Sequence, residues 1–338
     1  MKSAVIFGGT GFIGTHLSQF LLEDPAVQVV LADLSPPRNE RYTVALQNAL
    51  ASGRARYLNC DVRQPLPLYA LPDADVIFNL AAVHREPGHR AAEYYETNLQ
   101  GAEHVCAYAA ATGCTRIVFT SSISPYGPTE CKKDETSIPA PETPYGASKL
   151  VAEKIHLSWQ RARTDRKLLM IRPGVVFGPG EGGNVTRLIS SLVRGYFLYM
   201  GNRTTRKAGG YVKELCWVIS FGLEHQNRSG EAITTLNFSM DPPPAIEDFV
   251  EVISKIARIR RKPLSVPRAL LLGASYPIDA VARLFGIQQP ISPVRIQKLF
   301  RSTNIEPKRL RELGYVYHYS LQRAFEDWKT DRPEDFTL

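Results

Sequence analysis

Cysteine is scarce in this sequence, and long apolar runs are absent. The 338 residues include five cysteines, with no Cys-x-x-Cys pair and no spacing typical of metal ligands. This pattern fits a reducing cytosol and predicts no metal site. No uncharged apolar run reaches the roughly 18 residues that a membrane-spanning helix needs, so none is expected. Met1-Lys2-Ser3 leads directly into an apolar strand with no signal peptide, and we therefore expect a cytoplasmic protein.

Positive charge is in excess, but it is not concentrated. The formal net charge is +8 at pH 7 and the isoelectric point is near 9.2, yet the basic residues are spread over several segments. Neither an aromatic platform nor a helix-turn-helix accompanies them, so no nucleic-acid partner is expected. Two local concentrations remain, at Arg203, Arg206 and Lys207 and between Arg258 and Arg311. They form either a solvated surface or a field that attracts a diphosphate-bearing substrate.

A glycine-rich turn near the N-terminus is the most informative motif. The apolar segment Ala4-Val5-Ile6 runs into Phe7-Gly-Gly-Thr-Gly-Phe-Ile-Gly14 and then into a helical pattern. A strand, such a turn and a helix N-terminus hold the pyrophosphate of a dinucleotide. Gly8 permits the tight turn, Gly11 lets the backbone approach the phosphates, and Gly14 lets helix and strand pack closely. The predicted cofactor contacts in this loop are Gly8, Gly11, Phe12, Ile13 and Gly14.

The second predicted strand indicates which dinucleotide binds. Gln28-Val-Val-Leu-Ala32 ends in Asp33, where a carboxylate accepts hydrogen bonds from the adenosine ribose hydroxyls and repels a 2′-phosphate. The cofactor is therefore predicted to be NAD and not NADP. Arg38 and Arg41 follow soon after, and they leave open the alternative that a 2′-phosphate is held. A helix-packing turn that binds nothing is the further alternative for any glycine-rich turn.

Strand and helix patterns alternate through the first half of the chain. This alternation predicts an α/β fold, a doubly wound parallel sheet of the Rossmann type. Beyond Arg172 the alternation weakens, and proline and glycine become frequent. We therefore expect a dinucleotide-binding domain at 1–172 and a smaller, mostly helical substrate-binding region at 173–338, with segments that return to the sheet. Strands are predicted at 3–7, 27–33, 55–59, 75–81, 116–121 and 168–172, and helices at about 11–23, 40–52, 93–112, 145–164 and 245–258.

Hydroxyl groups and a Tyr-x-x-x-Lys pair are expected at the carboxyl edge of this sheet. The fifth predicted strand ends in Thr120-Ser121-Ser122. Downstream, Thr143 and Pro144 begin a long helix as N-cap and first residue, and the four-residue spacing of Tyr145 and Lys149 puts them on one face. The Lys149 ammonium and an oxidised nicotinamide would favour the phenolate of Tyr145 and make it a usable base. Taken alone, a Tyr-x-x-x-Lys pair is more often structural.

These motifs together resemble one family. The chain resembles an extended short-chain dehydrogenase/reductase of the NAD-dependent epimerase/dehydratase family, similar to nucleotide-sugar 4-epimerases. The resemblance implies a Rossmann fold with NAD as cofactor, and we expect a homodimer. Beyond Gly180 the resemblance is looser. Its motifs are the Gly8–Gly14 loop, Asp33, Cys60-Asp61-Val62, Asn79-Leu-Ala-Ala82, Thr97-Asn-Leu-Gln-Gly101, Thr120–Ser122 with Tyr126-Gly127, Tyr145–Lys149 and Ile171–Gly180.

The resemblance also implies roles for single residues. Tyr145 would be the general acid/base, and Lys149 would bind the nicotinamide ribose and depress the pKa of Tyr145. Ser122 would hydrogen-bond the reacting oxygen of the substrate. Asn98 would either be structural or hold a water in a proton relay. The remaining implied cofactor contacts are Asp61 at the adenine, and Val62, Ala81 and Ala82 along the cleft.

The substrate-binding half is mapped less closely by the resemblance. Asn184 resembles the asparagine that meets the diphosphate in nucleotide-sugar enzymes, and a helix N-cap is the alternative. Lys207 stands where the family often has arginine, and an ammonium cannot make the bidentate contact of a guanidinium. Arg295 matches a second phosphate-binding arginine, with plain surface charge as the alternative. His84, at the mouth of the cleft, either contacts a sugar hydroxyl or is merely solvated.

One absence narrows the chemistry within the family. Its dehydratases carry an Asp-Glu pair where this chain has Ser121 and Ser122, so dehydration is disfavoured. The favoured activity is C4 epimerisation of a nucleotide sugar, with a UDP-sugar as substrate. Reduction of a 4-keto sugar and oxidation of a more apolar alcohol are the alternatives. A further alternative is a protein that binds NAD without catalysing a reaction. The intact set of Ser122, Tyr145 and Lys149 argues against this alternative.

The C-terminal region keeps the apolar alternative open. Val266-Pro-Arg-Ala-Leu-Leu-Leu272 through Phe285 resembles the hydrophobic segment of 3β-hydroxysteroid dehydrogenase-like members. Pro277, Asp279 and Arg283 interrupt it, so it predicts one or two amphipathic helices over 266–286 and not a membrane span. These helices would form a substrate lid or part of the core, and peripheral membrane contact is the alternative.

Overall fold

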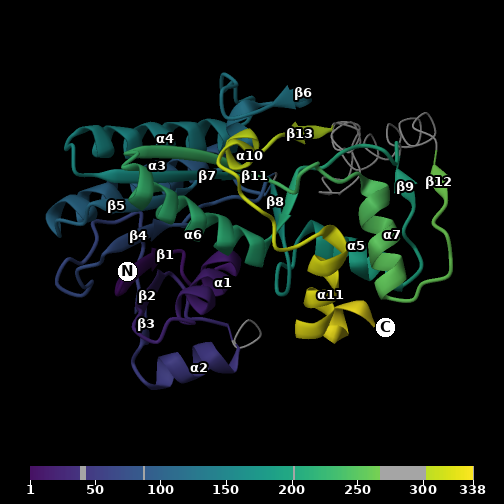
Figure 1. The fold of residues 1–338 in the computed structure, drawn as a ribbon, viewed down its shortest axis with the longest axis horizontal. Coiled ribbons are helices and arrows are strands. Elements are labelled where there is room, and N and C mark those ends of the chain that lie inside the picture. The colour runs from purple at the N-terminus through teal and green to yellow at the C-terminus, as the bar shows by residue number, and fades with distance from the viewer. Residues whose placement is uncertain (39–42, 87, 201, 267–301, 338) are drawn as a thin grey trace, which may run out of the picture.

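A seven-stranded parallel sheet is the centre of the fold (Figure 1). The computed structural model describes residues 1–338 except 39–42, 87, 201, 267–301 and 338. Every strand pairing in the sheet is parallel, so the carboxyl ends of all strands lie at one edge. In spatial order the strands are β11 (Ile233–Phe238), β7 (Lys167–Pro173), β5 (Arg116–Thr120), β4 (Val76–Asn79), β1 (Ser3–Phe7), β2 (Gln28–Asp33) and β3 (Ala55–Asn59).

Helices cover both faces of this sheet (Figure 1). Side chains alternate along each strand, so Val5 and Phe7 belong to the core on one face and Ala4 and Ile6 to the core on the other. Burial on both faces explains why these strands are continuous apolar runs in the sequence. On one face lie α3 (Ala91–Ala111) and α4 (Pro144–Arg161), and on the other α1 (Phe12–Leu21), α2 (Val44–Ala51) and α6 (Val212–Ser229).

The strand order changes direction at the middle of the sheet. From β1 the chain adds β2 and β3 on one side, and β4, β5, β7 and β11 on the other. The connections diverge there and leave a crevice at the carboxyl ends of β1 and β4, where ligands of open α/β sheets bind. The turn at Gly8 lies at this point, because a Cβ on Gly8 would come within 2.8 Å of the Ala81 backbone nitrogen after β4.

The prediction of a doubly wound parallel sheet is confirmed, and the six predicted strands form within a few residues of their expected bounds. The seventh strand, β11, was not predicted. Helix α6 and β11 continue the alternation beyond Arg172, and β11 pairs with β7. Two threonines and Asn237 make its sequence look too polar for a buried strand, although Thr234 and Asn237 are fully buried. The division at residue 172 stays a prediction, and β11 is a segment from beyond it that joins the sheet.

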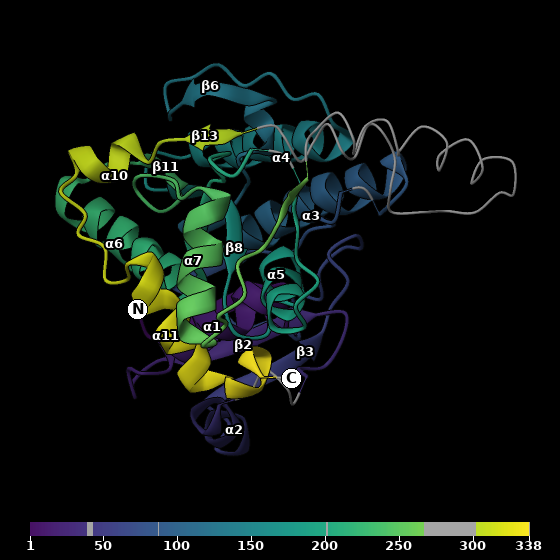
Figure 2. The same ribbon diagram turned by 90° about the vertical axis from the view of Figure 1, so that its right-hand side faces the viewer.

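A smaller lobe stands next to the carboxyl edge of the sheet (Figures 1 and 2). Its core is aromatic: the ring centroid of Phe177 lies 5.4 Å from that of Phe325 and 6.4 Å from that of Trp328. The helix predicted at about 245–258 is α7 in this lobe. Its helices are α5 (Asn184–Val193), α7 (Ile246–Ile256) and α11 (Leu321–Asp331), and short parallel pairs join β8 (Val175–Phe177) to β10 (Gly209–Tyr211), β9 (Tyr199–Met200) to β12 (Ser265–Val266) and β6 (Thr129–Lys133) to β13 (Thr303–Ile305).

A buried ion pair joins helix α4 to the sheet. Arg172 on β7 donates two hydrogen bonds to the Glu153 carboxylate on α4, at 2.8 and 2.7 Å. The two side chains are 9% and 2% exposed. Ser121 donates to the same carboxylate at 2.6 Å, and Arg172 also donates to the Tyr126 hydroxyl at 2.7 Å. Tyr126 in turn donates to Asn237 at 2.9 Å, so one network connects α4, β7 and β11.

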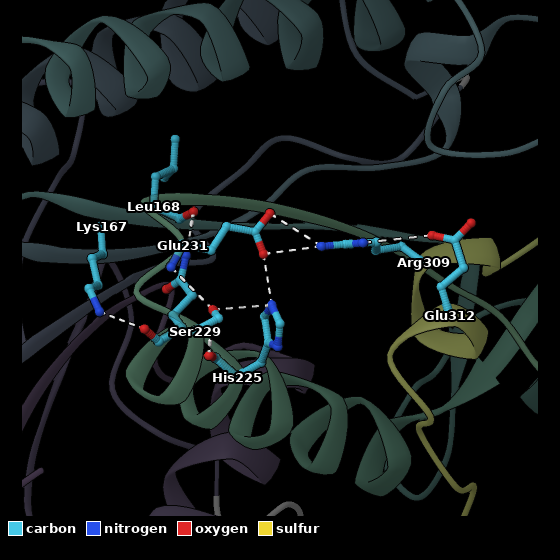
Figure 3. Close-up of polar contacts among 8 residues, drawn as sticks. Lys167, Leu168, His225, Ser229, Glu231, Arg309 and Glu312 are labelled. Carbon is cyan, nitrogen blue, oxygen red and sulfur yellow. Dashed lines mark hydrogen bonds and ion pairs between the residues drawn. The ribbon is translucent and has the colours of Figure 1, made fainter.

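A second set of polar contacts fastens the C-terminal segment to the outer edge of the sheet (Figure 3). Arg309 of α10 (Lys308–Glu312) lies 3.3 Å from Glu231, just before β11, and Glu231 lies 2.7 Å from His225 of α6. Gln226 on α6 donates to the Leu168 backbone oxygen at 3.0 Å. Because partly exposed ion pairs contribute little energy, this cluster serves mainly to set how α6, β11 and α10 meet.

Two further observations concern the described residues as a whole. None of their helices is both long and apolar enough to cross a bilayer. Within the same ranges, no three His, Cys, Asp or Glu side chains gather as a metal site. The amphipathic helices predicted over 266–286 lie, apart from Val266, outside the described residues.

We expect the Arg172–Glu153 pair to be costly to break from one side. Glu153→Ala leaves a buried guanidinium without its counter-charge, and it should lower the free energy of unfolding in urea by about 3–5 kcal/mol. The double variant Glu153→Leu/Arg172→Met removes both charges and should recover most of that loss. Asp165→Ala, which removes the exposed partner of Arg163, is the matched control. A loss for Glu153→Ala below about 1 kcal/mol, the range of surface pairs, contradicts the prediction.

Candidate active site

The glycine-rich turn between β1 and α1 forms an open cradle. Gly8 has a φ of +78°, which favours glycine, and a Cβ on Gly14 would lie 2.3 Å from the Gly8 carbonyl oxygen. A Cβ on Gly11 would meet only that oxygen, at 3.1 Å, so the space in front of it is open. No described side chain caps α1, and its first turn holds no acidic residue. The N–H groups at Phe12 and Ile13 therefore suit a bound anion such as a pyrophosphate.

Asp33 stands at the end of β2 beside this cradle. Its carboxylate accepts hydrogen bonds from the Thr10 backbone nitrogen at 3.1 Å and the Leu34 backbone nitrogen at 2.7 Å. A negative charge fixed in this place suits ribose hydroxyls and disfavours a 2′-phosphate. Arg38 is exposed, and Arg41 lies outside the described residues.

Asp61 and Val62, which follow Cys60 after β3, have different surroundings. Arg63 donates to both carboxylate oxygens of Asp61, at 2.9 and 2.7 Å, and these hydrogen bonds lower the pKa of Asp61. Val62 is buried against helix α3, where a Cβ on Gly101 would come within 3.0 Å of it. Val62 thus supports the rim of the crevice, and the contact of Asp61 with an adenine stays a prediction.

Asn98 on α3 braces the rim on the other side. Its Oδ1 accepts from the Val83 backbone nitrogen at 3.0 Å, and its Nδ2 donates to the Val83 oxygen at 3.2 Å and to Ser148 on α4 at 2.8 Å. The amide therefore uses both its hydrogens and its oxygen on the protein itself. Of the two alternatives drawn from the sequence, this geometry supports the structural one.

The segment after β4 lines the crevice. Ala81 and Ala82 are half-buried, and Ala81 is the residue that Gly8 approaches. His84 follows at the exposed mouth. Desolvation by neighbouring protein atoms lowers the pKa of His84, and the charge of Lys149 acts in the same direction. His84 thus lies within electrostatic range of Lys149, and its contact with a sugar stays a prediction.

Helix α4 brings Tyr145 to Ser122. Thr143 caps the helix, as predicted, by accepting a hydrogen bond from the Gly146 nitrogen at 3.1 Å, and a proline follows it. The helix packs closely on the turn after β5, because a Cβ on Gly146 would lie 2.7 Å from the Ser124 carbonyl oxygen. At this contact the Ser122 side chain lies close enough to the Tyr145 phenol to lower its pKa, while the Ser122 hydroxyl donates a hydrogen bond to Ser124 at 3.1 Å. The roles of Ser122 and Tyr145 in a reaction stay a prediction.

Lys149 lies one helical turn further along the same face and is 2% exposed. Its Nζ donates a hydrogen bond to the Thr120 backbone oxygen at 2.6 Å and lies 4.4 Å from the centroid of the Phe119 ring. Burial lowers the pKa of Lys149 to about 7, and the Glu153 carboxylate one turn away opposes that shift. The ammonium form is therefore only weakly favoured near neutral pH.

In the chain without a nucleotide, burial raises the pKa of Tyr145 to about 12, and the Ser122 side chain opposes that shift. Lys149 does little to oppose it, because Lys149 is itself close to neutral and bonds Thr120 instead of the phenol. The chain alone therefore holds a neutral phenol at pH 7. Deprotonation requires additional positive charge, such as the oxidised nicotinamide that the prediction included. The expectation that Lys149 and an oxidised nicotinamide together depress this pKa stays a prediction.

The three predicted diphosphate contacts differ in what the structure shows of them. Helix α5 begins at Asn184 with Gly183 as its N-cap, so the N-cap alternative for Asn184 is wrong; its Oδ1 accepts from Arg187 at 2.7 Å. Lys207 is half-buried, and burial lowers its pKa. Arg295 lies outside the described residues. Convergence of the three on a diphosphate stays a prediction.

Two residues of this region were not singled out from the sequence. Glu153 and Arg172 hold α4, the helix that carries Tyr145 and Lys149, against β7, which lies beside β5 in the sheet. A signal was present, because Glu153 continues the four-residue spacing of Tyr145 and Lys149 along one face of the helix. A carboxylate on the buried face of a helix requires a buried cation as its partner.

The chain is similar to known proteins over nearly its whole length. The family model described as NAD dependent epimerase/dehydratase family matches residues 4–235. The chain is 27% identical to the N-acetyl-alpha-D-glucosaminyl-diphospho-ditrans,octacis-undecaprenol 4-epimerase of Escherichia coli O157:H7, over 96% of this chain and 93% of that protein. It is 25% identical to the 3beta-hydroxysteroid-dehydrogenase/decarboxylase isoform 1 of Arabidopsis thaliana, over 95% of this chain and 77% of that protein.

Solved structures share the fold. The UDP-glucuronic acid 4-epimerase from Bacillus cereus, solved in complex with NAD, superposes with a TM-score of 0.75 at 20% identity, over 97% of this chain and 99% of that one. The UDP-galactose 4-epimerase superposes with a TM-score of 0.73 at 19% identity, over 98% of this chain and 99% of that one.

We expect Asp33 to set the cofactor preference. The wild type should bind NAD more tightly than NADP, and Asp33→Ser should narrow that ratio by about tenfold or more, because juxtaposed like charges cost several kcal/mol. Fluorescence titration of both cofactors measures the ratio. Asp24→Ser, the same change at an exposed site away from the cradle, should leave it unchanged. Equal wild-type affinities would assign the 2′-phosphate to Arg38 or Arg41 instead.

The buried Lys149 should give the nucleotide-free protein a measurable pH dependence. Its pKa falls from an ordinary value to about 7, so at higher pH, up to an ordinary lysine value of about 10.4, the unfolded chain binds a proton that the folded one does not. The stability of the wild type relative to Lys149→Met should therefore rise with pH, by about 2 kcal/mol between pH 7 and 9. Urea unfolding at several pH values measures this, with Lys154→Met on the exposed side of α4 as control. A constant difference contradicts the prediction.

Proposed function

The chain belongs to the NAD-dependent epimerase/dehydratase family, and we propose that this enzyme inverts C4 of a sugar carried on a diphosphate. The Ser122 side chain beside the Tyr145 phenol, with Lys149 on the same helix face, carries the proposal. This group stands at the carboxyl edge of the sheet that also bears the glycine cradle. The positions of the dehydratase carboxylate pair hold Ser121 and Ser122, and Ser121 donates to Glu153.

NAD is the cofactor of the family, and this chain's residues fit it. The cradle of Gly8, Gly11 and Gly14 suits the pyrophosphate, and Asp33 suits the adenosine ribose. When bound, NAD supplies a reversible acceptor for a hydride from C4. The other cofactor contacts that we propose are Phe12, Ile13, Asp61, Val62, Ala81, Ala82, Tyr145 and Lys149.

Tyr145 takes the proton of the C4 hydroxyl and later returns it, while Ser122 orients the same oxygen by a hydrogen bond. The Ser122 side chain lies beside the Tyr145 phenol, so we assign both groups to one substrate oxygen. Burial holds the pKa of Tyr145 at about 12, so the phenolate forms only with positive charge nearby. Lys149 has a pKa of about 7, and a phenolate forming near it favours its protonated form. The two groups are therefore expected to titrate as a coupled pair.

The diphosphate is the second part of the proposal. Lys207 is half-buried near the end of the chain segment that leads into β10, and with Asn184 and Arg295 we assign it to the substrate phosphates. The two solved 4-epimerases above are named for UDP-sugars, and the bacterial relative is named for a sugar on undecaprenyl diphosphate. A nucleoside and a polyprenol both present a diphosphate next to the sugar, so the same contacts serve either carrier.

Replacement of Tyr145 tests the reaction. The purified protein, given UDP-hexoses and polyprenyl-diphosphate hexoses in turn, should interconvert the C4 epimers of one class, measured by chromatography of the released sugar. Tyr145→Phe should lower kcat by about 10²–10⁴, the usual share of a general acid/base, with NAD binding nearly intact. Tyr94→Phe, the same change on a ring 5.9 Å away, should keep most of the activity. A Tyr145→Phe rate above about a tenth of the wild type contradicts the assignment, and oxidation of sterols without any epimerisation would favour the apolar alternative.

A further inference from the structure

The smaller lobe carries an apolar face that its core does not use. Strands β9 and β12 pair in parallel, with Tyr199 opposite Ser265. Side chains alternate along a strand, and Tyr199 points inward, where it is buried in the aromatic core. Leu198 and Met200 on either side of Tyr199, together with Leu264 directly before β12, are instead exposed and point outward. These three side chains, here called the ribbon face, are 41%, 48% and 67% exposed.

A run of basic residues leads into the ribbon face. Between α7 and β12 the chain reads Arg258-Ile-Arg-Arg-Lys262, and all four basic side chains are exposed. Arg261 lies beside β9, since its Nη1 is 3.4 Å from the Gly195 backbone oxygen. Helix α7 ends at Ile256, and a helix dipole favours cations only within its last turn. Arg260, Arg261 and Lys262, here called the basic flank, therefore lie beyond the reach of the dipole of α7.

The ribbon face and the basic flank lie at the same end of the molecule. β9 and β12 lie beside α7, far from β2 and β3 (Figure 1), and Figure 2 turns this end toward the viewer. At the other end of β9 the Arg203 guanidinium lies 5.2 Å from the ring centroid of Tyr199. From Met200 a short loop leads to Lys207, one of the assigned phosphate contacts. The ribbon face is therefore close along the chain to the substrate side of the lobe.

The chemistry of this surface selects among occupants. Single-stranded nucleic acid is bound by stacking on aromatic side chains, but the ribbon face is aliphatic. Arginine and methionine are common in protein interfaces, but a second copy of this chain would bring the same positive charge against the basic flank. Exposed aliphatic side chains next to arginine and lysine are instead typical of surfaces that enter the headgroup region of anionic bilayers.

We propose that the ribbon face and the basic flank dock the protein onto an anionic lipid bilayer. The aliphatic side chains enter the boundary of the acyl chains, and the cations meet the lipid phosphates. This docking presents the crevice to substrates held at the membrane. It does not rest on the proposed reaction, because binding needs neither a sugar nor NAD.

Vesicle sedimentation with the full chain tests the proposal. The wild type should sediment with vesicles of phosphatidylglycerol and phosphatidylcholine and remain in solution with vesicles of phosphatidylcholine alone. Leu198→Glu/Met200→Glu/Leu264→Glu should weaken binding about tenfold or more, because it puts charge on the inserted face. Val44→Glu/Leu68→Glu, which changes exposed apolar residues near α2 and β3, is the control and should bind as the wild type does.

A second set of variants tests the charge without touching the apolar side chains. Arg260→Gln/Arg261→Gln/Lys262→Gln should weaken binding about tenfold or more, because each cation near an anionic surface attracts it, and added salt should weaken the wild type in the same way. Lys154→Gln/Arg161→Gln/Arg228→Gln removes as much exposed charge elsewhere and should bind nearly as before. Unchanged thermal unfolding and NAD binding show that each variant is folded.

Several results would overturn the docking. The docking is contradicted if the wild-type protein stays in solution with phosphatidylglycerol vesicles. It is also contradicted if the glutamate variant of the ribbon face still sediments with them. Equal binding to neutral vesicles removes the role of the basic flank. A wild type that is a dimer in ultracentrifugation, with a monomeric ribbon-face variant, would assign the face to contact between two copies. None of these outcomes depends on whether the protein epimerises a sugar.

Discussion

The geometry of the crevice depends on the buried pairing of Arg172 with Glu153. Helix α4 carries Tyr145 and Lys149, yet the residues that place it on the sheet are Glu153 two turns beyond Tyr145 and Arg172 at the end of β7. Removing both charges from water is expensive, and only a bidentate contact with further hydrogen bonds offsets that cost. Ser121 and Tyr126 provide those bonds. A lateral shift of the helix would break the two Arg172 bonds and the Ser121 bond to Glu153 together, so the pair fixes where the phenol stands.

Charge is scarce inside this crevice, and that scarcity sets its chemistry. Lys149 is buried with its Nζ on the Thr120 carbonyl oxygen, and desolvation brings its pKa to about 7. Tyr145 is neutral for the same reason, with a pKa of about 12. Each charged form is unfavourable alone, and each becomes more favourable beside the other. At rest the phenol is therefore neutral and Lys149 is divided between its two forms near pH 7, so a single positive charge that arrives with a ligand shifts the protonation of both groups.

The sequence predicts the parts of this protein that depend on local chemistry. The Gly8–Gly14 turn, the Thr143 cap and the four-residue spacing of Tyr145 and Lys149 are each determined by neighbours in the chain, and each is found in the structure. Strand β11 was missed because its Thr234 and Asn237 are polar side chains buried by partners far away in sequence. The burial that raises the pKa of Tyr145 in the chain alone was not predicted, because the burial of a site by the whole fold cannot be read from spacing.

The two halves of the molecule bear on different questions about its activity. The groups that we propose to react all come from the sheet and from a helix packed on it, which the Arg172–Glu153 network holds in place. The smaller lobe is held by an aromatic core around Phe177 and by short two-stranded pairs, which constrain its outer surface far less. Under the proposed function, a change of carrier from a nucleoside to a lipid needs changes only in the lobe and its surface, while the proposed proton-transfer groups can stay as they are. The proposed reaction thus depends on the crevice, and the proposed carrier depends on the surface around Lys207 and the ribbon face.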